Sequence, residues 1–452
     1  MVSCVPAHPK KTTPALRATP PKEGNFRWQL RFNKQRCSGK LVSMRRVKLA
    51  GAALIVTLGL MASACAANTQ NGLMTAQPIA NMTVQQPTTT QASAIESFGE
   101  KLFNQTLTGN VNAVVSPLSA YTALGMAYEG AAGSTAQAFQ DVMGMTPEEA
   151  RATLAYLLTT WQSNQNGTVV TSANSAWMDK SLTVHQQWVD TLKSYYQADV
   201  YNLDLNASGT LKQVNGWISE KTNKLIPAML ETMPPNAKAL LVNALYLKAD
   251  WAQPFNTNNT HQWQFTKADG QTVDAWYMSD TPEGAKHFVT AGAEGVVLPY
   301  KDGRLAFVAA MPTSGNLTLG GGDISGWLAA ATSDQVTVTM PKFHTEFGSD
   351  LTQTLSDMGL SVAMNGNADF SGIAVPGLYI SEVLQKVVMD VGEEGTVAAA
   401  ATVVAMPTSG APNPVVVNFD KPYIYAIVDQ LTGVPLFIGA MDDPSLAPPT
   451  VK

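Results

Sequence analysis

The sequence is poor in cysteine and in charge. Only three of its 452 residues are cysteine, Cys4, Cys37 and Cys65, so the last 387 residues can hold neither a disulfide nor a thiolate metal site. Charged residues make up 14% and the formal net charge is −5. Without a basic stripe or an acidic tail, nothing indicates a nucleic acid as partner. Apolar residues make up 45%, which is enough for a large core.

Residues in catalytic arrangements are also missing. The four histidines after Cys65 form no His-Glu-x-x-His pair, and no Gly-x-Ser-x-Gly turn is present. Gly320-Gly321-Gly322 is not followed by the lysine of a phosphate-binding loop. Glu393 and Glu394 are neighbours, but adjacent carboxylates rarely converge on one bond. We therefore expect no enzyme activity, no cofactor and no bound metal.

The one cysteine with an informative context is Cys65. A basic segment, 44–48, precedes an apolar run, 49–61, which is too short to cross a bilayer. Ala62-Ser63-Ala64 then leads to Cys65, the layout of a secretory signal peptide over 44–65. This end resembles a bacterial lipobox, although Ala62 stands where leucine is usual. We expect a lipid on Cys65 and an extracytoplasmic protein anchored to the cell surface or outer membrane. The alternative is cleavage after Ala64 or Ala67, which would release a secreted protein.

Two segments beside the signal have compositions that do not favour packing. Residues 1–43 are basic and rich in proline, and we interpret them as a non-native extension upstream of a true start at Met44. The alternative is a long cytoplasmic tail before a signal anchor. Residues 66–91 carry no charge and consist mostly of Ala, Asn, Thr, Gln and Pro. This composition predicts a disordered tether.

A single folded domain is predicted over 92–445, and its pattern favours an α+β fold. Apolar residues have helical spacing over 93–104 and over 211–218, where Thr210 can cap the helix. Another helix is expected after Ser116, with Pro117 at its first position. Helices come mostly first and strands later. Apolar or alternating runs predict strands at 239–247, 305–311, 335–340, 383–391, 415–419, 423–429 and 435–440.

The stretch from Gly392 to Pro414 lies between two predicted strands and fits neither a helix pattern nor a polar loop. An alanine helix or a flexible linker would be the ordinary interpretation. However, its alanines run into Thr402-Val403-Val404, which prefer strands. A long uncharged strip of small, strand-prone residues is what a spare strand requires, because such side chains can enter a sheet without clashing.

Five motifs in order resemble the serpin family over about 92–445. Residues 393–401 are similar to the serpin hinge, and 112–119 with 130–135 resemble the start and continuation of the family's second helix. Residues 243–251 resemble the central strand that ends at the tryptophan of the "breach", here Trp251. Residues 419–423 and 435–439 resemble the two C-terminal strand motifs.

This resemblance implies one domain of three β-sheets and about eight or nine helices with an exposed reactive-centre loop. It implies a monomer whose partner is a target serine protease. The protease attacks the loop as a substrate and forms a covalent acyl-enzyme. The freed hinge then enters the main sheet and drags the protease with it, so that the inhibitor acts irreversibly and only once. The implied hinge residues are Glu393, Glu394, Gly395, Thr396, Ala398, Ala399, Ala400 and Ala401.

Two departures from the family pattern lie inside the domain. The family usually has histidine at the position of Gln385, bonded to the "shutter" residues that here are Ser116, Ser119 and Asn243. A glutamine amide can bridge these groups but cannot become cationic. Tyr423 stands where phenylalanine is common, so one additional hydroxyl must be satisfied.

The scissile bond is one of two. The family's spacing from the hinge indicates Ser409–Gly410, whereas the local sequence favours Thr408–Ser409. Neither position is charged, so we expect elastase-like or subtilisin-like targets. The alternative is a non-inhibitory serpin-fold binding protein, and an enzyme on this fold is a more distant one. The small residues Ala398 to Ala401 favour inhibition.

Overall fold

The computed structural model describes residues 72–108, 111–161, 166–314, 318–375, 377–396 and 414–449, all in the unit Ala66–Lys452. The α-helices are α1 (Thr89–Leu107), α2 (Pro117–Tyr128), α3 (Gly133–Met143), α4 (Pro147–Trp161), α5 (Gln186–Tyr195), α6 (Thr210–Lys221), α7 (Asp323–Ala330) and α8 (Thr352–Leu355). Short 3-10 or π turns lie at Thr257–Asn259, Ser356–Leu360, Ser361–Met364 and Pro444–Leu446.

The strands are β1 (Val114–Val115), β2 (Thr168–Asp179), β3 (Thr183–Val184), β4 (Asp199–Leu203), β5 (Ala239–Asp250), β6 (His261–Thr266), β7 (Thr272–Asp280), β8 (Lys286–Val289), β9 (Ala293–Pro299), β10 (Leu305–Pro312), β11 (Val336–Pro341), β12 (Phe343–Asp350), β13 (Ala374–Val375), β14 (Leu384–Gly392), β15 (Gly395–Thr396), β16 (Val415–Asn418), β17 (Tyr423–Asp429) and β18 (Pro435–Met441).

These strands form three large sheets. The main sheet has the order β12-β14-β15-β5-β2-β4, and a second six-stranded sheet has the order β1-β18-β17-β10-β9-β8. The third sheet, β16-β11-β7-β6, has four strands, and β13 pairs only with β3. With eight α-helices in the described residues, the fold is the α+β arrangement that the sequence predicted.

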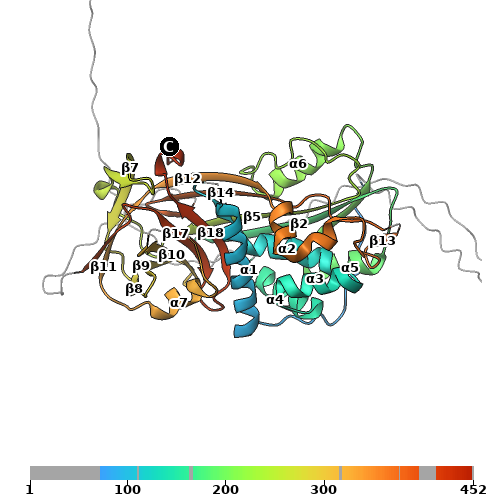
Figure 1. Cartoon of the computed structure of the whole chain (residues 1–452), viewed down its shortest axis with the longest axis horizontal. Coiled ribbons are helices and arrows are strands. Elements are labelled where there is room, and N and C mark those ends of the chain that lie inside the picture. The colour runs from blue at the N-terminus through green and yellow to red at the C-terminus, as the bar shows by residue number, and fades with distance from the viewer. Residues whose placement is uncertain are drawn as a thin grey trace, which may run out of the picture. The chain divides into compact units, whose positions relative to one another are not determined.

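The main sheet is covered on both faces. Figure 1 shows α6 over one face and α1 to α5 on the other, while the remaining two sheets gather at the end where β11 lies. Along β14 the side chains alternate, so that Gln385, Val387, Met389 and Val391 are buried toward the larger core. The opposite face forms a smaller core with α6 around Trp177. Side chains on the larger-core face are called inward below.

The predicted strands match β5, β10, β11, β14, β16, β17 and β18 within about three residues at each end. Ser116 caps α2 as expected, because its hydroxyl accepts from the Ser119 N–H at 3.2 Å. The predicted cap at Thr210 is wrong by one residue. Gly209 occupies the cap of α6, and Thr210 instead donates to the Asp204 carbonyl at 2.7 Å.

The predicted tether over 66–91 is wrong for the part that the structure describes. Helix α1 already begins at Thr89, which Thr88 and Gln91 cap reciprocally. Residues 72–88 lie against the domain, and several of their side chains pack on its core. Low charge and few large residues do not exclude order where the body of the protein supplies the apolar surface and the hydrogen-bond partners. Residues 1–71, including the predicted extension, signal and Cys65, lie outside the described residues.

Two buried carboxylates join α1 to α7. Glu100 accepts the N–H groups of Gly322 and Asp323 at 2.8 and 3.0 Å, and Glu96 accepts that of Ser325 at 2.6 Å. These bonds satisfy the free donors at the start of α7. Burial raises the pKa of Glu100 to about 7, against the lowering effect of the backbone donors, and the neighbouring Glu96 raises it further.

Candidate functional site

The site begins where β15 enters the main sheet between β14 and β5. Gly395 lies opposite Gly392 of β14 and Asp250 of β5, and Thr396 lies opposite Val391 and Ala249. Both pairings are antiparallel. The predicted hinge therefore already forms the first two residues of an additional central strand in the intact chain.

Glycine is required at 395 by close approach and by backbone angle. A Cβ on this residue would lie 2.1 Å from the carbonyl oxygen of Ala249, and φ is +145°. Few residues with a side chain adopt that angle, and no flexible side chain can move away to relieve the contact. Gly395 thus allows the chain to turn back into the sheet beside β5.

Thr396 is the first hinge residue whose side chain points inward. It is 1% exposed, and its hydroxyl lies 2.7 Å from that of Tyr300. Burial raises the pKa of Tyr300 far above its usual range, so this phenol stays protonated. The pair satisfies two polar groups that would otherwise be buried without partners.

Trp251 fixes the turn that leads into the hinge. Its ring Nε1–H donates to the Gly392 carbonyl at 2.9 Å, and its backbone N–H donates to the Glu394 carbonyl at 2.9 Å. The indole stacks on Tyr300 with ring centroids 4.7 Å apart and planes 1° apart. Trp251, predicted as the breach residue, therefore holds the turn through both its side chain and its backbone.

The carboxylate of Glu393 is held on the other side of this turn. Lys342 Nζ lies 2.8 Å from one carboxylate oxygen, and the Thr260 hydroxyl donates to the other at 2.7 Å. Burial raises the pKa of Glu393, but these bonds outweigh burial and leave the pKa below its usual value. Its backbone carbonyl accepts the Phe255 N–H at 2.8 Å.

Beyond Thr396 the inner edges of β14 and β5 have no strand partner among the described residues. β14 pairs along its outer edge with β12 over Leu384–Val391, and β5 pairs with β2 over Ala239–Ala249. Among the described strands, only β15 lies between β14 and β5. The sheet thus presents two parallel edges that a further strand can join.

Near the start of β14, Gln385 connects this strand to Ser116 at the start of α2. Its Nε2 donates to the Ser116 carbonyl at 2.9 Å, and its Oε1 accepts the Ser116 N–H at 2.9 Å. The Ser116 hydroxyl donates to the Leu436 carbonyl at 2.7 Å. The idea that Gln385 also bridges Ser119 and Asn243 is wrong in the intact structure, because its amide binds the backbone N–H and carbonyl of a single residue, Ser116.

Asn243 of β5 belongs to a separate polar group that it forms with two residues of β2. Its Nδ2 donates to the oxygens of Ser172 and Asn174, and Asn174 in turn donates to the Tyr196 carbonyl at 2.7 Å. Asn243 is 3% exposed, and its Oδ1 has no hydrogen-bond partner. A buried acceptor without a partner raises the free energy of the intact state. A state that supplies a donor would remove this cost.

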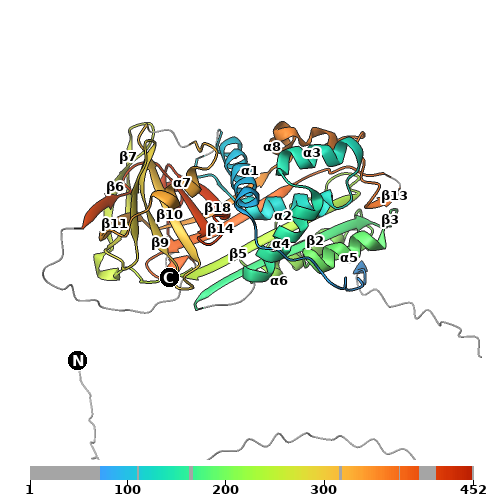
Figure 2. The same cartoon turned by 90° about the horizontal axis from the view of Figure 1, so that it is seen from below.

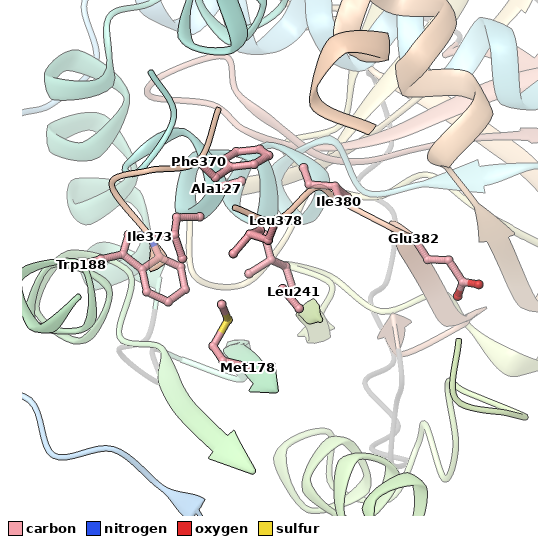
Figure 3. A pocket seen from close by; sticks show the side chains of 10 residues that line it. Ala127, Met178, Trp188, Leu241, Phe370, Ile373, Leu378, Ile380 and Glu382 are labelled. Carbon is pink, nitrogen blue, oxygen red and sulfur yellow. The ribbon is translucent and has the colours of Figure 1, made fainter. Parts of the chain in front are cut away.

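At the lower end of β5 an apolar cavity lies under the main sheet. Figure 3 shows Met178, Leu241, Trp188 and Ile373 facing one another around it, with Glu382 at its edge and the carboxylate turned away. The other residues that line it are Ala127, Ala239, Phe370, Leu378 and Ile380. Burial raises the pKa of Glu382, and the nearby Asp350 raises it further.

Several predicted residues lie outside the described residues, namely Ala398, Ala399, Ala400, Ala401, Thr408, Ser409, Gly410 and Cys65. Sequence reasoning missed Tyr300, Lys342 and Thr260, which complete the hinge site, and Asn174, which holds Asn243. No local pattern marks them, since those three lie beside strand ends at positions 51 to 133 residues from their partners in the chain. Only the fold brings them there.

No three or more His, Cys, Asp or Glu side chains converge as a metal site within the described residues. None of the helices described between residues 72 and 449 is both long and apolar enough to cross a membrane. The described part of the site is a two-residue strand, β15, held between β14 and β5.

Comparison with known proteins gives a consistent match. A family model described as Serpin (serine protease inhibitor) matches residues 93–444. An uncharacterised serpin-like protein of Thermococcus kodakarensis is 32% identical over 367 residues, which cover 78% of this chain and 85% of that protein. Plasminogen activator inhibitor 1 of Bos taurus is 27% identical over 383 residues, covering 79% and 94%. The structure of tengpin, a thermophilic serpin in the native state, matches with a TM-score of 0.75 at 27% identity, covering 82% of this chain and 97% of that chain.

Proposed function

Because the chain belongs to the serpin family of serine protease inhibitors, we propose that it inhibits a protease irreversibly by loop cleavage and insertion of the freed strand between β14 and β5. The protease serine attacks the scissile carbonyl, the new amine leaves, and the ester joins the two proteins. Insertion before hydrolysis of this ester traps the protease. The inhibitor itself supplies a strand and no catalytic group.

The register of β15 is the observation that carries this proposal. Thr396 is paired with Val391 and Ala249, so each further residue would advance one position along both neighbours. The seven residues 397–403 would then lie opposite 390–384 of β14 and 248–242 of β5. Over these positions neither β14 nor β5 has a described strand partner on the edge that faces the other, so the inserted residues could pair with both strands once the two separate.

The side chains suit these positions. In the continued register Ala398 and Ala400 would point inward, between the large side chains of Met389 and Leu247 and of Val387 and Leu245. Small residues fit there without displacing the core.

The first polar inward position after Thr396 is Thr402. It would lie between Gln385 and Asn243, where its hydroxyl can donate to the Asn243 Oδ1 that has no partner in the intact chain. Further on, Val404 and Met406 would reach Leu241 and Ala239, which line the apolar cavity. Apolar and polar side chains of the strip thus match the apolar and polar positions of the sheet.

We place the cleavage at Thr408–Ser409 or Ser409–Gly410 and propose elastase-like or subtilisin-like proteases as targets. Uncharged residues on both sides of either bond support this choice, because a trypsin-like pocket would keep an unpaired buried carboxylate.

The test is to mix the purified protein with pancreatic elastase and with subtilisin and to look for an SDS-stable complex. Trypsin serves as the matched control, and we expect it to give little complex. A chain that is cut at 408–410 without forming a complex with any of the three proteases would favour the alternative, a serpin-fold binding protein that does not inhibit.

We also propose that a lipid on Cys65 anchors the mature protein outside the cytoplasm. The basic segment 44–48, the short apolar run and the small residues before Cys65 support this location. One acyl chain binds a membrane only weakly, and stable attachment needs more than one. Fractionation of cells that express the wild-type and the Cys65→Ala chains tests the anchor, with the wild-type protein expected in the membrane fraction.

A further inference from the structure

Residues 72–85 form a segment, here called the N-terminal strap, that is fastened to the domain along its whole length. At its start Leu73 pairs with Tyr201 of β4, and the Met74 N–H donates to the Val200 carbonyl at 2.7 Å. A side chain at Gly72 would clash with Asn202 and Leu203, and φ there is +80°. The strap therefore joins the outer edge of the main sheet at a close-fitting point.

The strap continues across α5 and reaches α4. The Gln77 N–H donates to the Asp190 carboxylate at 2.7 Å, and the Ile79 N–H donates to the Ser194 hydroxyl at 3.2 Å. At its end the Gln85 N–H donates to the Ala152 carbonyl at 3.4 Å. The side chains of Met74, Ala76, Ile79 and Met82 pack against the main core.

The point where the strap meets the sheet lies far from the hinge. Leu73 pairs with Tyr201, Tyr201 with Trp177, and Trp177 with Leu240 of β5. Gly395 lies opposite Asp250 of the same strand, ten residues further on. At about 3.3 Å per residue the two points are about 33 Å apart along the sheet. In both Figure 1 and Figure 2, β13 and β11 mark opposite ends of the domain, with α5 toward the end of β13.

We infer that the strap fixes the exit of the N-terminal segment at the end of the domain opposite the hinge, so that a surface-anchored molecule presents the hinge end away from the surface. Six residues lie between Cys65 and Gly72, so seven Cα–Cα steps join the two. Fully extended they span about 25 Å at most. The fastened end of the domain therefore stays close to the anchor, and the hinge lies about 33 Å further along.

The partner that fits this geometry is a soluble protease that arrives from the surrounding medium. A disordered tether over the whole of 66–91 would have allowed every orientation, whereas the strap attaches the chain to the domain from Gly72 onward. The orientation at a surface rests on the proposed anchor at Cys65. The position of the exit does not, and it can be measured without a membrane.

The experiment measures energy transfer within the full chain. Cys4→Ser and Cys37→Ser leave Cys65 as the single thiol for an acceptor dye. A genetically encoded fluorescent residue replaces either Val375 of β13 or Val416 of β16, both of which are exposed. β13 pairs with β3, and Gln186, two residues after β3, donates to the strap at the Thr75 carbonyl. β16 is the first described strand after residues 397–413 and begins at Val415.

We expect strong transfer from position 375 and weak transfer from position 416. The dye pair is chosen so that its Förster distance lies between the expected distances from Cys65 to these two positions. Met74→Pro with Gln77→Pro removes two backbone donors of the strap, and the difference should shrink at least twofold. Met74→Leu with Gln77→Ala keeps both donors and serves as the control.

Equal transfer from the two positions in the wild-type strap would overturn the inference, as would stronger transfer from 416. An unchanged difference in the proline variant would also overturn it, because the strap contacts would then not set the exit. None of these results depends on inhibition or on lipid attachment, which the complex assay and the fractionation test separately.

Discussion

Arginine placed at two adjacent hinge positions should have unequal effects if the strip continues the register of β15. Ala398 would point inward, between Met389 and Leu247, which are 1% and 4% exposed. Ala399 would point toward α6, beside Val388 and Tyr246, which are only half-buried. The same charge is therefore added one residue apart on opposite faces of the sheet.

The expected magnitudes follow from burial. A guanidinium at 398 would lie between the apolar side chains of Met389 and Leu247, and an unpaired buried charge costs several kcal/mol. Because each 1.4 kcal/mol is a tenfold change in rate, a cost of about 3 kcal/mol in the transition state slows insertion by about a hundredfold. An arginine at 399 can extend past α6 with its charge in water, so its cost is about 1 kcal/mol or less.

The assay counts molecules of inhibitor consumed for each elastase molecule trapped. Ala398→Arg should be cut as a substrate with almost no SDS-stable complex, whereas Ala399→Arg should retain most of the inhibition. Thr396→Val is a further control. Its hydroxyl bond to Tyr300 exists before insertion, so this variant should lose stability but keep its inhibitory stoichiometry. Equal losses in the two arginine variants would refute the continued register, and full inhibition by both would refute insertion itself.

Four further outcomes are expected. A single cut between Thr408 and Gly410 should raise the midpoint of thermal unfolding, since the freed strip gains bonds on both sides; a lowered midpoint would exclude insertion. Tyr423→Phe should stabilise the intact domain by about 1 kcal/mol in denaturant titration, because the Tyr423 hydroxyl is buried without a partner. The intact fold binds a proton at Glu100 that the unfolded chain releases above its ordinary pKa of 4.5, so this contribution to stability is complete below pH 4.5 and is lost as the pH rises to about 7. Glu100→Gln should remove that slope from unfolding curves measured across this range, and an unchanged slope would assign it to other groups. Cys65→Ala should move the protein from the membrane fraction to the soluble one, and unchanged fractionation would point to an uncleaved signal anchor.

Some elements of the structure could be predicted from the sequence and others could not. The strands β14, β17 and β18 are continuous or alternating apolar runs, and such runs are local signals that need no knowledge of the fold. The cap at Ser116 was equally local, since a serine followed by proline suits the start of a helix. No local pattern of this kind predicts the strap. Its residues are small, polar and uncharged, and they are ordered by partners in β4, α5 and α4 that only the folded domain provides.

The sequence by itself determined the α+β class and the absence of cysteine and of the catalytic motifs considered above from the domain. Each of these depends on residue type or on short-range order. Only the tertiary structure decided that Gly395 and Thr396 are already in the sheet, that Gln385 binds Ser116 and leaves Asn243 to β2, and that Tyr300, Lys342 and Thr260 complete the hinge site. These are contacts between residues far apart in the chain, and their register is set by the packing of whole strands, which no local pattern encodes.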